Sequence, residues 1–181
     1  MSTLVFLEHN GDSAVKGALG VLGKAASLDP DTAAVVIGSG VGAIAAQAAQ
    51  HGAAKVYVVD DASVAAALPQ PRVDVIAALV TEHGFDTVLF GASVLAADVA
   101  GGLAARLDAG LNWDMVDISG AGESLVGKRP ALGDSVYVDV AWTSSPRLGM
   151  FRSGSFDPVE KAAAGEVVNV APTLEDFSSK A

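Results

Sequence analysis

The chain contains no cysteine, few aromatic residues and few positive charges. The absence of cysteine from its 181 residues excludes disulfide bonds, thiolate metal ligands, iron–sulfur ligation by this chain and a cysteine nucleophile. Lysine and arginine number 11 against 21 aspartates and glutamates, so the net charge of −10 argues against binding to nucleic acid or to an anionic membrane surface. The three histidines lie far apart and form no paired ligand motif, so no metal site is predicted.

Long apolar runs are also missing. No segment approaches the roughly 20 apolar residues of a membrane-spanning helix, and the N-terminus lacks the basic and apolar regions of a signal peptide. We therefore expect a cytoplasmic protein with no membrane insertion. Hydrophobic residues make up 51% of the chain, and much of this share is alanine and valine, which favours close packing of helices on a sheet.

Short apolar segments alternate with helical patterns through the first part of the chain. Each of these segments reads as a buried strand followed by apolar residues at helical spacing, and they span residues 3–8, 33–37, 55–59 and 87–90. The alternation predicts an α/β fold with a doubly wound, mostly parallel, Rossmann-like sheet of the adenine-nucleotide-binding type. Beyond about residue 110 we expect short strands that extend the same sheet and its edge, with residues 147–152 as the returning arm of a hairpin.

A glycine-rich loop follows the second predicted strand and opens a helix. Gly38, Ser39, Gly40 and Gly42 could hold a phosphate on backbone N–H groups, and Asp60 after the third strand could accept a ribose hydroxyl. The spacing differs from the G-x-G-x-x-G dinucleotide motif, and no Gly-Lys-Ser/Thr sequence follows as in a P-loop. A tight strand-to-helix turn and a solvated turn aspartate explain the same residues more simply.

No catalytic constellation is visible. Ser93 follows a strand but lacks the G-x-S-x-G elbow of a hydrolase, and Ser39 has no histidine or carboxylate partner in the sequence. A triad is defined by spatial roles, and nothing in the spacing here indicates one. The sequence therefore predicts no enzyme.

Positive charges gather in one place in the last third of the chain. Lys128 and Arg129 stand side by side, and Arg147 and Arg152 flank a predicted strand. Two interpretations stay open for them: solvated edge charges that discourage pairing between sheets, or a docking surface for another domain or an acidic partner. The two tryptophans, Trp113 and Trp142, are more typical of core or interface anchors than of cofactor contacts.

Four segments together resemble one known family. They are TLVFLEHN (3–10), AAVVIGSGVGAIAAQAAQHGAAKVYVVDDA (33–62), DTVLFGASVLAADVAGGLAARLDAGLNWDMVDI (86–118) and KRPALGDSVYVDVAWTSSPRLGMFRSGSFDPV (128–159). In order and spacing they are similar to the N-terminal domain of the alpha subunit of electron-transfer flavoprotein. The last segment carries the family's Arg-Pro at Arg129 and its Arg-x-Gly-x-Phe from Arg152 to Phe156.

The resemblance implies a component of an FAD-containing electron carrier and not an enzyme. Such proteins are heterodimers of alpha and beta subunits. They carry electrons from flavoprotein dehydrogenases, including the acyl-CoA dehydrogenases of fatty acid beta-oxidation, to a quinone oxidoreductase. The flavin is held mainly by the second domain of the alpha subunit, whereas the first domain is a scaffold that packs against the beta subunit. The AMP carried by the related beta-subunit fold is not expected in the first domain.

The resemblance also sets the expected domain boundaries. Residues 1–171 would form the N-terminal α/β domain, and residues 172–181 would be a linker toward a C-terminal FAD-binding domain that is absent from this sequence. The chain is thus expected to be a fragment that holds no FAD by itself.

Partner contacts are expected on the late strands. Because an exposed sheet edge suits docking, Trp142, Arg147, Met150 and Phe151 are the candidate contacts with the beta subunit. The alternative hypothesis is a stand-alone adenine-nucleotide-binding module built on the glycine-rich loop. A small oxidoreductase or hydrolase would rest on fold class alone.

Overall fold

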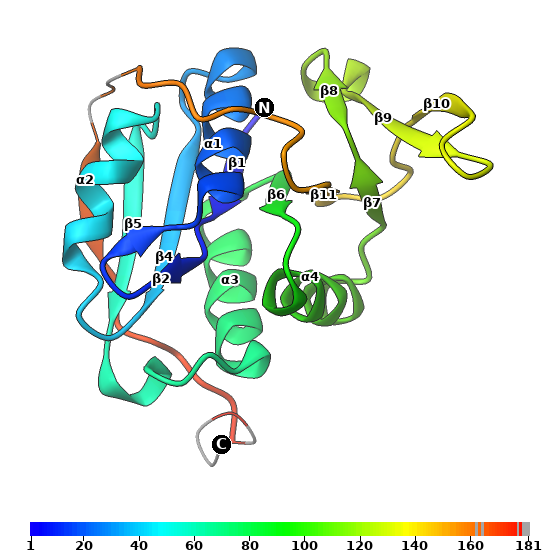
Figure 1. Ribbon diagram of the computed structural model, residues 1–181. Coiled ribbons are helices and arrows are strands. Elements are labelled where there is room, and N and C mark those ends of the chain that lie inside the picture. Colours follow the sequence, from blue (N-terminus) through cyan, green and yellow to red (C-terminus); the bar gives the residue numbers. More distant parts are fainter. Residues whose placement is uncertain (162, 164, 177, 179–181) are drawn as a thin grey trace.

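A computed structural model describes residues 1–161, 163, 165–176 and 178 of the chain (Figure 1). Within this part, seven strands form one sheet in the order β12-β5-β4-β1-β6-β11-β7, and every pairing in it is parallel. The strands are β1 (Thr3–Phe6), β4 (Ala33–Gly38), β5 (Lys55–Asp60), β6 (Thr87–Gly91), β7 (Leu111–Met115), β11 (Arg147–Phe151) and β12 (Glu166–Asn169). The helices are α1 (Lys16–Leu28), α2 (Gly42–Gln50), α3 (Pro69–His83) and α4 (Val94–Leu107), with 3-10 turns η1 (Ala62–Val64) and η2 (Gly122–Ser124).

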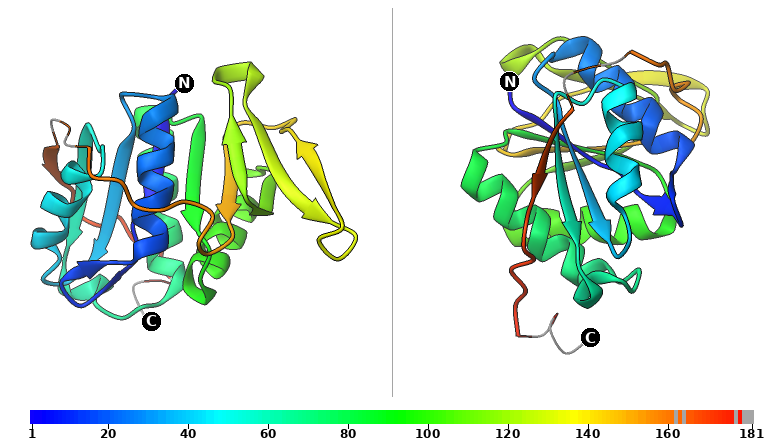
Figure 2. Two further views of the ribbon diagram at one scale, coloured as in Figure 1. Left: turned by 45° about the horizontal axis from the view of Figure 1, so that its top comes forward. Right: turned by 90° about the vertical axis from the view of Figure 1, so that its left-hand side faces the viewer.

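The sheet is buried on both faces. In β1, Leu4 and Phe6 pack with α3 and α4, whereas Val5 and Leu7 beyond its end pack with α1 and α2. Successive side chains of a strand point to opposite faces, so a strand covered on both sides needs a continuous apolar run. The right-hand view of Figure 2 shows the two helix pairs on opposite sides of the sheet. The predicted doubly wound, parallel fold is confirmed.

The order of the central strands creates a crevice at their carboxyl ends. The chain lays down β1, β4 and β5 toward one edge, then returns to place β6 on the other side of β1. Helices on the two sides of β1 consequently leave in opposite directions, which opens a crevice outside the carboxyl ends of β1 and β6. A two-stranded hairpin, β2 (His9–Asn10) with β3 (Ser13–Ala14), follows β1 at this edge.

The last third of the chain departs from expectation at β11. This strand is not the arm of a hairpin, because it lies inside the main sheet, parallel to both β6 and β7. Leu148 and Met150 pack into the core on the α3/α4 side, and Phe151 packs into the core on the α1/α2 side. A strand that is apolar on both faces is stable in the interior of a parallel sheet and not at an exposed edge.

A separate antiparallel sheet stands beside the main one. It consists of β8 (Asp117–Ser119), β9 (Val126–Ala131) and β10 (Val136–Val140), in the order β10-β9-β8. We call it the small sheet; Figure 2 shows it projecting from the body of the domain. The expectation that all late strands extend one sheet is therefore only partly met: β7, β11 and β12 join the main sheet, whereas β8, β9 and β10 form the small sheet.

The segment of residues 152–161, which follows β11, contains no helix or strand and crosses the outer surface of α1 (Figure 1). Where it crosses, a Cβ atom at Gly20 would overlap the carbonyl oxygen of Phe156. The glycine therefore permits the close approach of the segment to the helix. Further along, the N–H of Lys161 donates to the carbonyl oxygen of Gln50 at 2.8 Å, which ties the segment to the end of α2.

The chain beyond β12 runs along α3. Leu174 packs against the core on that side, and the N–H of Glu175 donates to Asp74 Oδ2 at 3.1 Å. Asp74 is 4% exposed and also accepts a hydrogen bond from Arg106 Nη2 at 2.9 Å. One buried carboxylate thus joins α3, α4 and the segment predicted to be a linker.

Candidate functional site

The carboxyl ends of the central strands bring the predicted loop residues to one edge. The glycine-rich loop follows β4, Asp60 ends β5, and Ser93 follows β6. Glu8, just beyond β1, lies between them in the strand order. Because parallel strands share the direction of their carboxyl ends, these residues all lie at the same edge of the sheet.

The loop itself is held by a carboxylate of the protein. The N–H of Gly40 donates to Asp60 Oδ1 at 2.6 Å. Gly40 has a positive φ of 73°, a conformation that glycine adopts without strain. Because Asp60 occupies an N–H that a phosphate would need and adds negative charge beside it, the loop is a carboxylate-braced turn rather than an open anion site.

A second internal contact bridges the crevice between β1 and β6. The hydroxyl of Ser93 donates to the Glu8 carboxylate and at the same time accepts the N–H of Ala96 at 2.9 Å, as the N-cap of α4. His9 Nε2 lies 3.2 Å from the carbonyl oxygen of Ile37, and its Nδ1 lies 3.1 Å from that of Gly11. In the described residues no hydrogen bond joins Ser93 to a histidine, as the serine–histidine pair of a hydrolase triad would require.

Arg72 is the residue at this edge that the sequence argument missed. It is only 3% exposed, although it belongs to the first turn of α3. Its guanidinium donates to the carbonyl oxygens of Ala66 and Leu68 at 2.8 and 2.9 Å and to that of Ile37 at 3.3 Å. Burial lowers the pKa of Arg72, and the nearby Glu8 carboxylate opposes this effect. The sequence signal was its position inside an apolar helical pattern.

A small cavity opens between these groups. Its volume is about 170 Å³, and Phe6, Glu8, His9, Asn10, Ala65, Ala67, Arg72 and Leu95 line it. A flavin dinucleotide carries a diphosphate, which needs free N–H groups or cations. Here the N–H of Gly40 donates to Asp60, the Arg72 guanidinium donates to carbonyl oxygens, and the Glu8 carboxylate lines the cavity. The residues at this edge do not fit FAD, so we assign no flavin chemistry to them.

The small sheet presents the second candidate site, an apolar surface open to solvent. Trp113 of β7 is 56% exposed and Tyr137 of β10 is 63% exposed, with Val136 and Val138 also exposed. In the described residues β10 pairs only with β9, so its other edge is open. Large exposed apolar side chains beside an open strand edge are typical of an interaction surface.

The predicted basic cluster lies within this surface. Lys128 and Arg129 belong to β9, the middle strand of the small sheet, and the Arg129 guanidinium lies 5.9 Å from the centre of the Trp113 ring. A cation over an indole face is attracted by the ring quadrupole. Arg129 is therefore combined with an exposed aromatic side chain, which for this residue favours the docking interpretation over that of a simple edge charge.

The four residues expected at an exposed edge lie elsewhere. Met150 and Phe151 are buried, so the assumption of an exposed β11 edge is wrong for them. Arg147 forms an ion pair with Asp86, with Nη1 and Oδ1 3.5 Å apart. Trp142 Nε1 donates to the carbonyl oxygen of Leu148 at 2.7 Å, and this half-buried indole lies at the base of the small sheet. Contact of Arg147 or Trp142 with a partner stays a prediction.

The fold and these surfaces define a Rossmann-like α/β domain in which side chains of the protein itself bridge the edge at the carboxyl ends of the strands. The model of the electron transfer flavoprotein domain matches residues 3–175, and the chain belongs to this family. It is similar to the electron transfer flavoprotein subunit alpha of Syntrophomonas wolfei, with 32% identity over 96% of this chain and 56% of that protein. The subunit alpha of Mycobacterium tuberculosis is 34% identical over 92% of this chain and 52% of that protein.

A third relative is the protein FixB of Clostridium saccharobutylicum, 29% identical over 97% of this chain and 55% of that protein. The chain thus spans about half the length of the curated relatives that it matches. In the part that the structure describes, no helix combines the length and the apolar character needed to cross a membrane.

Proposed function

We propose that this chain is the N-terminal domain of the alpha subunit of an FAD-containing electron-transfer flavoprotein. Its role is that of a scaffold and of a docking surface for the beta subunit, in a carrier that is not itself an enzyme. The family match and the similarity to subunits alpha over about half their length support this assignment. Residues 1–171 are then the domain, and residues 172–181 lead toward the remaining part of the subunit.

The whole carrier would work in the cytoplasm. It would accept electrons from flavoprotein dehydrogenases, such as acyl-CoA dehydrogenases, and deliver them to a quinone oxidoreductase. FAD supplies the redox chemistry when it is bound in the complete protein. The contribution of this chain is to bind and orient the partner, since its own ligand edge is braced by Asp60 and bridged by Glu8 and Ser93.

One observation carries the docking role: the large apolar side chains that the small sheet and the neighbouring strand β7 expose to solvent. Tyr137 and Trp113 are exposed although both are large, and they lie on a part of the chain that projects from the domain. Aromatic side chains and arginine are enriched where proteins bind each other, and Arg129 lies beside Trp113 here. The register of β9 and β10 places Tyr137 and the Trp113–Arg129 pair on opposite faces of the hairpin, so a partner that encloses the hairpin would remove both aromatic rings from water.

The test is co-purification of this chain with the electron-transfer flavoprotein beta subunit of the same organism. The wild-type chain and the Val94→Asp variant should form a stable one-to-one complex in size-exclusion chromatography. Val94 is 84% exposed on α4 and serves as the matched control for a new surface charge. The Tyr137→Asp variant should elute as free chain. Equal complex formation by both variants would remove the small sheet from the interface, and no complex with the wild-type chain would overturn the proposed function.

A further inference from the structure

The surface just described depends on an irregularity in β7. Leu148 of β11 faces Leu111 of β7, but Phe151 faces Met115, so β7 contains one residue more than β11 between these pairs. Such a bulge bends a strand and changes the direction of its side chains. Asp114 lies in the bulge with a positive φ of 58°, a conformation that aspartate tolerates better than most residues.

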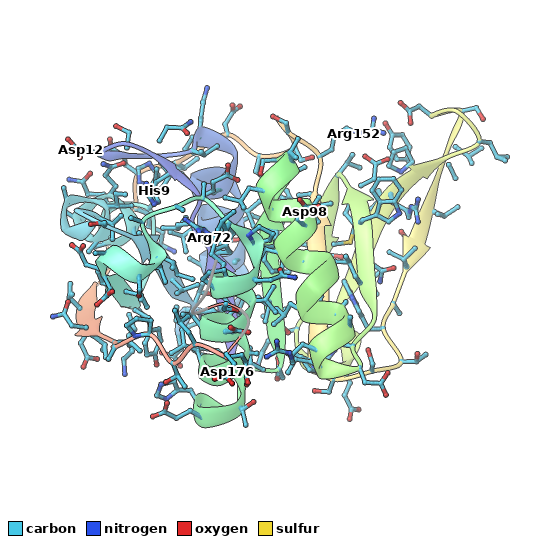
Figure 3. All side chains as sticks on the ribbon, turned by 90° about the horizontal axis from the view of Figure 1, so that it is seen from below. His9, Asp12, Arg72, Asp98, Arg152 and Asp176 are labelled. Atoms are coloured by element: carbon cyan, nitrogen blue, oxygen red, sulfur yellow. The ribbon has the colours of Figure 1, made fainter. Side chains whose placement is uncertain are left out.

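Arg152, directly after β11, binds this bulge and the small sheet at the same time. Its Nε and Nη2 donate to the two carboxylate oxygens of Asp114 at 2.8 and 2.9 Å. Its Nη1 and Nη2 donate to the two carboxylate oxygens of Asp134 at 3.0 and 3.2 Å. Asp134 belongs to the turn between β9 and β10, and Figure 3 shows Arg152 between the main sheet and this hairpin.

The guanidinium geometry suits this double contact. A planar guanidinium can bind a carboxylate through two parallel hydrogen bonds, and here both forks of the same group are used. The hydrogen bonds donated to Asp114 and Asp134 raise the pKa of Arg152 above its ordinary value, so the cation is permanent. Its side chain is nevertheless 41% exposed, and exposed ion pairs add little to global stability. The geometric effect of Arg152 therefore matters more than its effect on unfolding.

The base and the tip of the small sheet are held in different ways. At the base, Gly127 and Val140 pack with Met115 and Trp142. A Cβ atom at Gly127 would overlap the sulfur of Met115, which shows how closely the base packs. At the tip, Val136 and Val138 are exposed. The hydrogen bonds that Arg152 donates to Asp134 join the turn to the main sheet.

We propose that Arg152 is a positioning residue for the beta subunit: it fixes the tip of the small sheet, and with it the exposed apolar side chains of β10, in the docking arrangement before the partner arrives. This inference rests on the proposed function and adds to it the residue that prepares the surface. A surface that is ordered in advance loses less conformational freedom on binding. We call Arg152 with its hydrogen bonds to Asp114 and Asp134 the clamp. If removal of the clamp lowers the population of the docking arrangement to about a tenth, the apparent dissociation constant rises about tenfold.

The test compares variants of the full 181-residue chain in titration calorimetry with the purified beta subunit. Arg152→Gln and Asp134→Asn should each bind about tenfold more weakly. Arg152→Lys keeps the charge but loses both forks, so it should also bind more weakly than wild type. Asp139→Asn is the matched control: it removes one carboxylate from the same hairpin and should leave the affinity within twofold.

Hydrogen exchange of the free chain separates positioning from simple stability. In Arg152→Gln and Asp134→Asn, amides of residues 131–138 should exchange faster, while the amides of β1 and β4 keep their protection. Asp134→Asn leaves the Asp114 contact intact, so it tests the clamp even if Arg152→Gln fails to fold.

Faster exchange at the tip with an unchanged dissociation constant would overturn the positioning role and leave the docking role of the small sheet standing. Unchanged exchange at the tip would overturn the clamp itself. A wild-type chain that binds no beta subunit would overturn the proposed function, and the positioning role with it.

Discussion

Replacement of Trp113 by alanine should weaken the complex with the beta subunit strongly. Trp113 is 56% exposed in the free chain. An indole side chain presents about 250 Å² of surface, so roughly 140 Å² remains to be covered by a partner, worth about 3.5 kcal/mol at ~25 cal/mol per Å². Alanine keeps a small part of this area, so we expect a loss of about 2–3 kcal/mol, or about 30- to 150-fold in the dissociation constant.

Titration calorimetry of the chain against the purified beta subunit measures this loss directly. Repeated at several temperatures, the titration should also show a less negative heat-capacity change for Trp113→Ala, because less apolar surface is removed from water. The control is Val94→Ala, which truncates another exposed apolar residue on a different element. Trp113→Ala itself should cost the free chain at most about 1 kcal/mol of folding stability, since it loses mainly the contact with Arg129.

The reasoning fails if Trp113→Ala binds within twofold of wild type. That result would mean that the indole stays in water in the complex and that the partner covers another face. Equal losses in Trp113→Ala and Val94→Ala would mean that truncation of any exposed apolar residue weakens binding, and the argument from this particular surface would be lost.

Further changes should act on stability. Gly20→Ala should lower the free energy of unfolding in urea by roughly 1–3 kcal/mol, because the added Cβ atom overlaps the segment that crosses α1. Gly17→Ala on the same helix is the control: the space around Gly17 is open, so this variant should raise the free energy of unfolding by about 0.5–1 kcal/mol. Arg106→Ala should lower the free energy of unfolding by about 2–3 kcal/mol, because loss of the arginine leaves the buried Asp74 carboxylate without its cation. Asp74→Ala should lower it by only about 1–2 kcal/mol, because the remaining Arg106 can reach solvent. The hydrogen bond from Arg152 lowers the pKa of Asp114 below its ordinary 3.8. The contribution of ionised Asp114 to folding stability is therefore complete above pH 3.8 and is lost as the pH falls through the lowered pKa. Acid titration of tryptophan fluorescence should follow this loss. AMP at millimolar concentration should give no heat of binding, and a saturable isotherm would contradict the braced-loop interpretation.

Much of the main sheet could be predicted from the sequence because local signals and tertiary structure agree there. The strands β1, β4, β5 and β6 each contain a continuous apolar run and are each followed by a helical pattern, and such runs are stable only in a sheet covered on both faces. The same physical rule also applied to β11, whose residues Leu148 to Phe151 are buried. The preceding turn suggested a hairpin instead, and turn signals give no information about which distant strand becomes the neighbour.

The position of the candidate site in the fold could be predicted from the sequence, but the hydrogen bonds within the site could not. Strand ends identify the edge where Gly40, Asp60 and Ser93 gather, because parallel strands share the direction of their carboxyl ends. The sequence could not show that Asp60 binds the loop or that Ser93 binds Glu8, because these pairs depend on side-chain distances across separate strands. Pairings between distant residues, such as Arg152 with Asp114 and Asp134, leave no periodic pattern for the same reason.

The position of β12 has a consequence for how the chain reaches its folded state. β12 pairs with β5, with Glu166 opposite Lys55 and Asn169 opposite Val58, although the two strands come from distant parts of the chain. During synthesis from the N-terminus, β5 therefore presents an open edge until almost the whole domain has been made. The pairing of β12 with β5 joins distant parts of the chain and therefore loses much conformational entropy on loop closure. This step should come late in folding and limit the folding rate. The edge of β5 is thus protected from mispairing only after the crossing of α1 has brought β12 into place beside it.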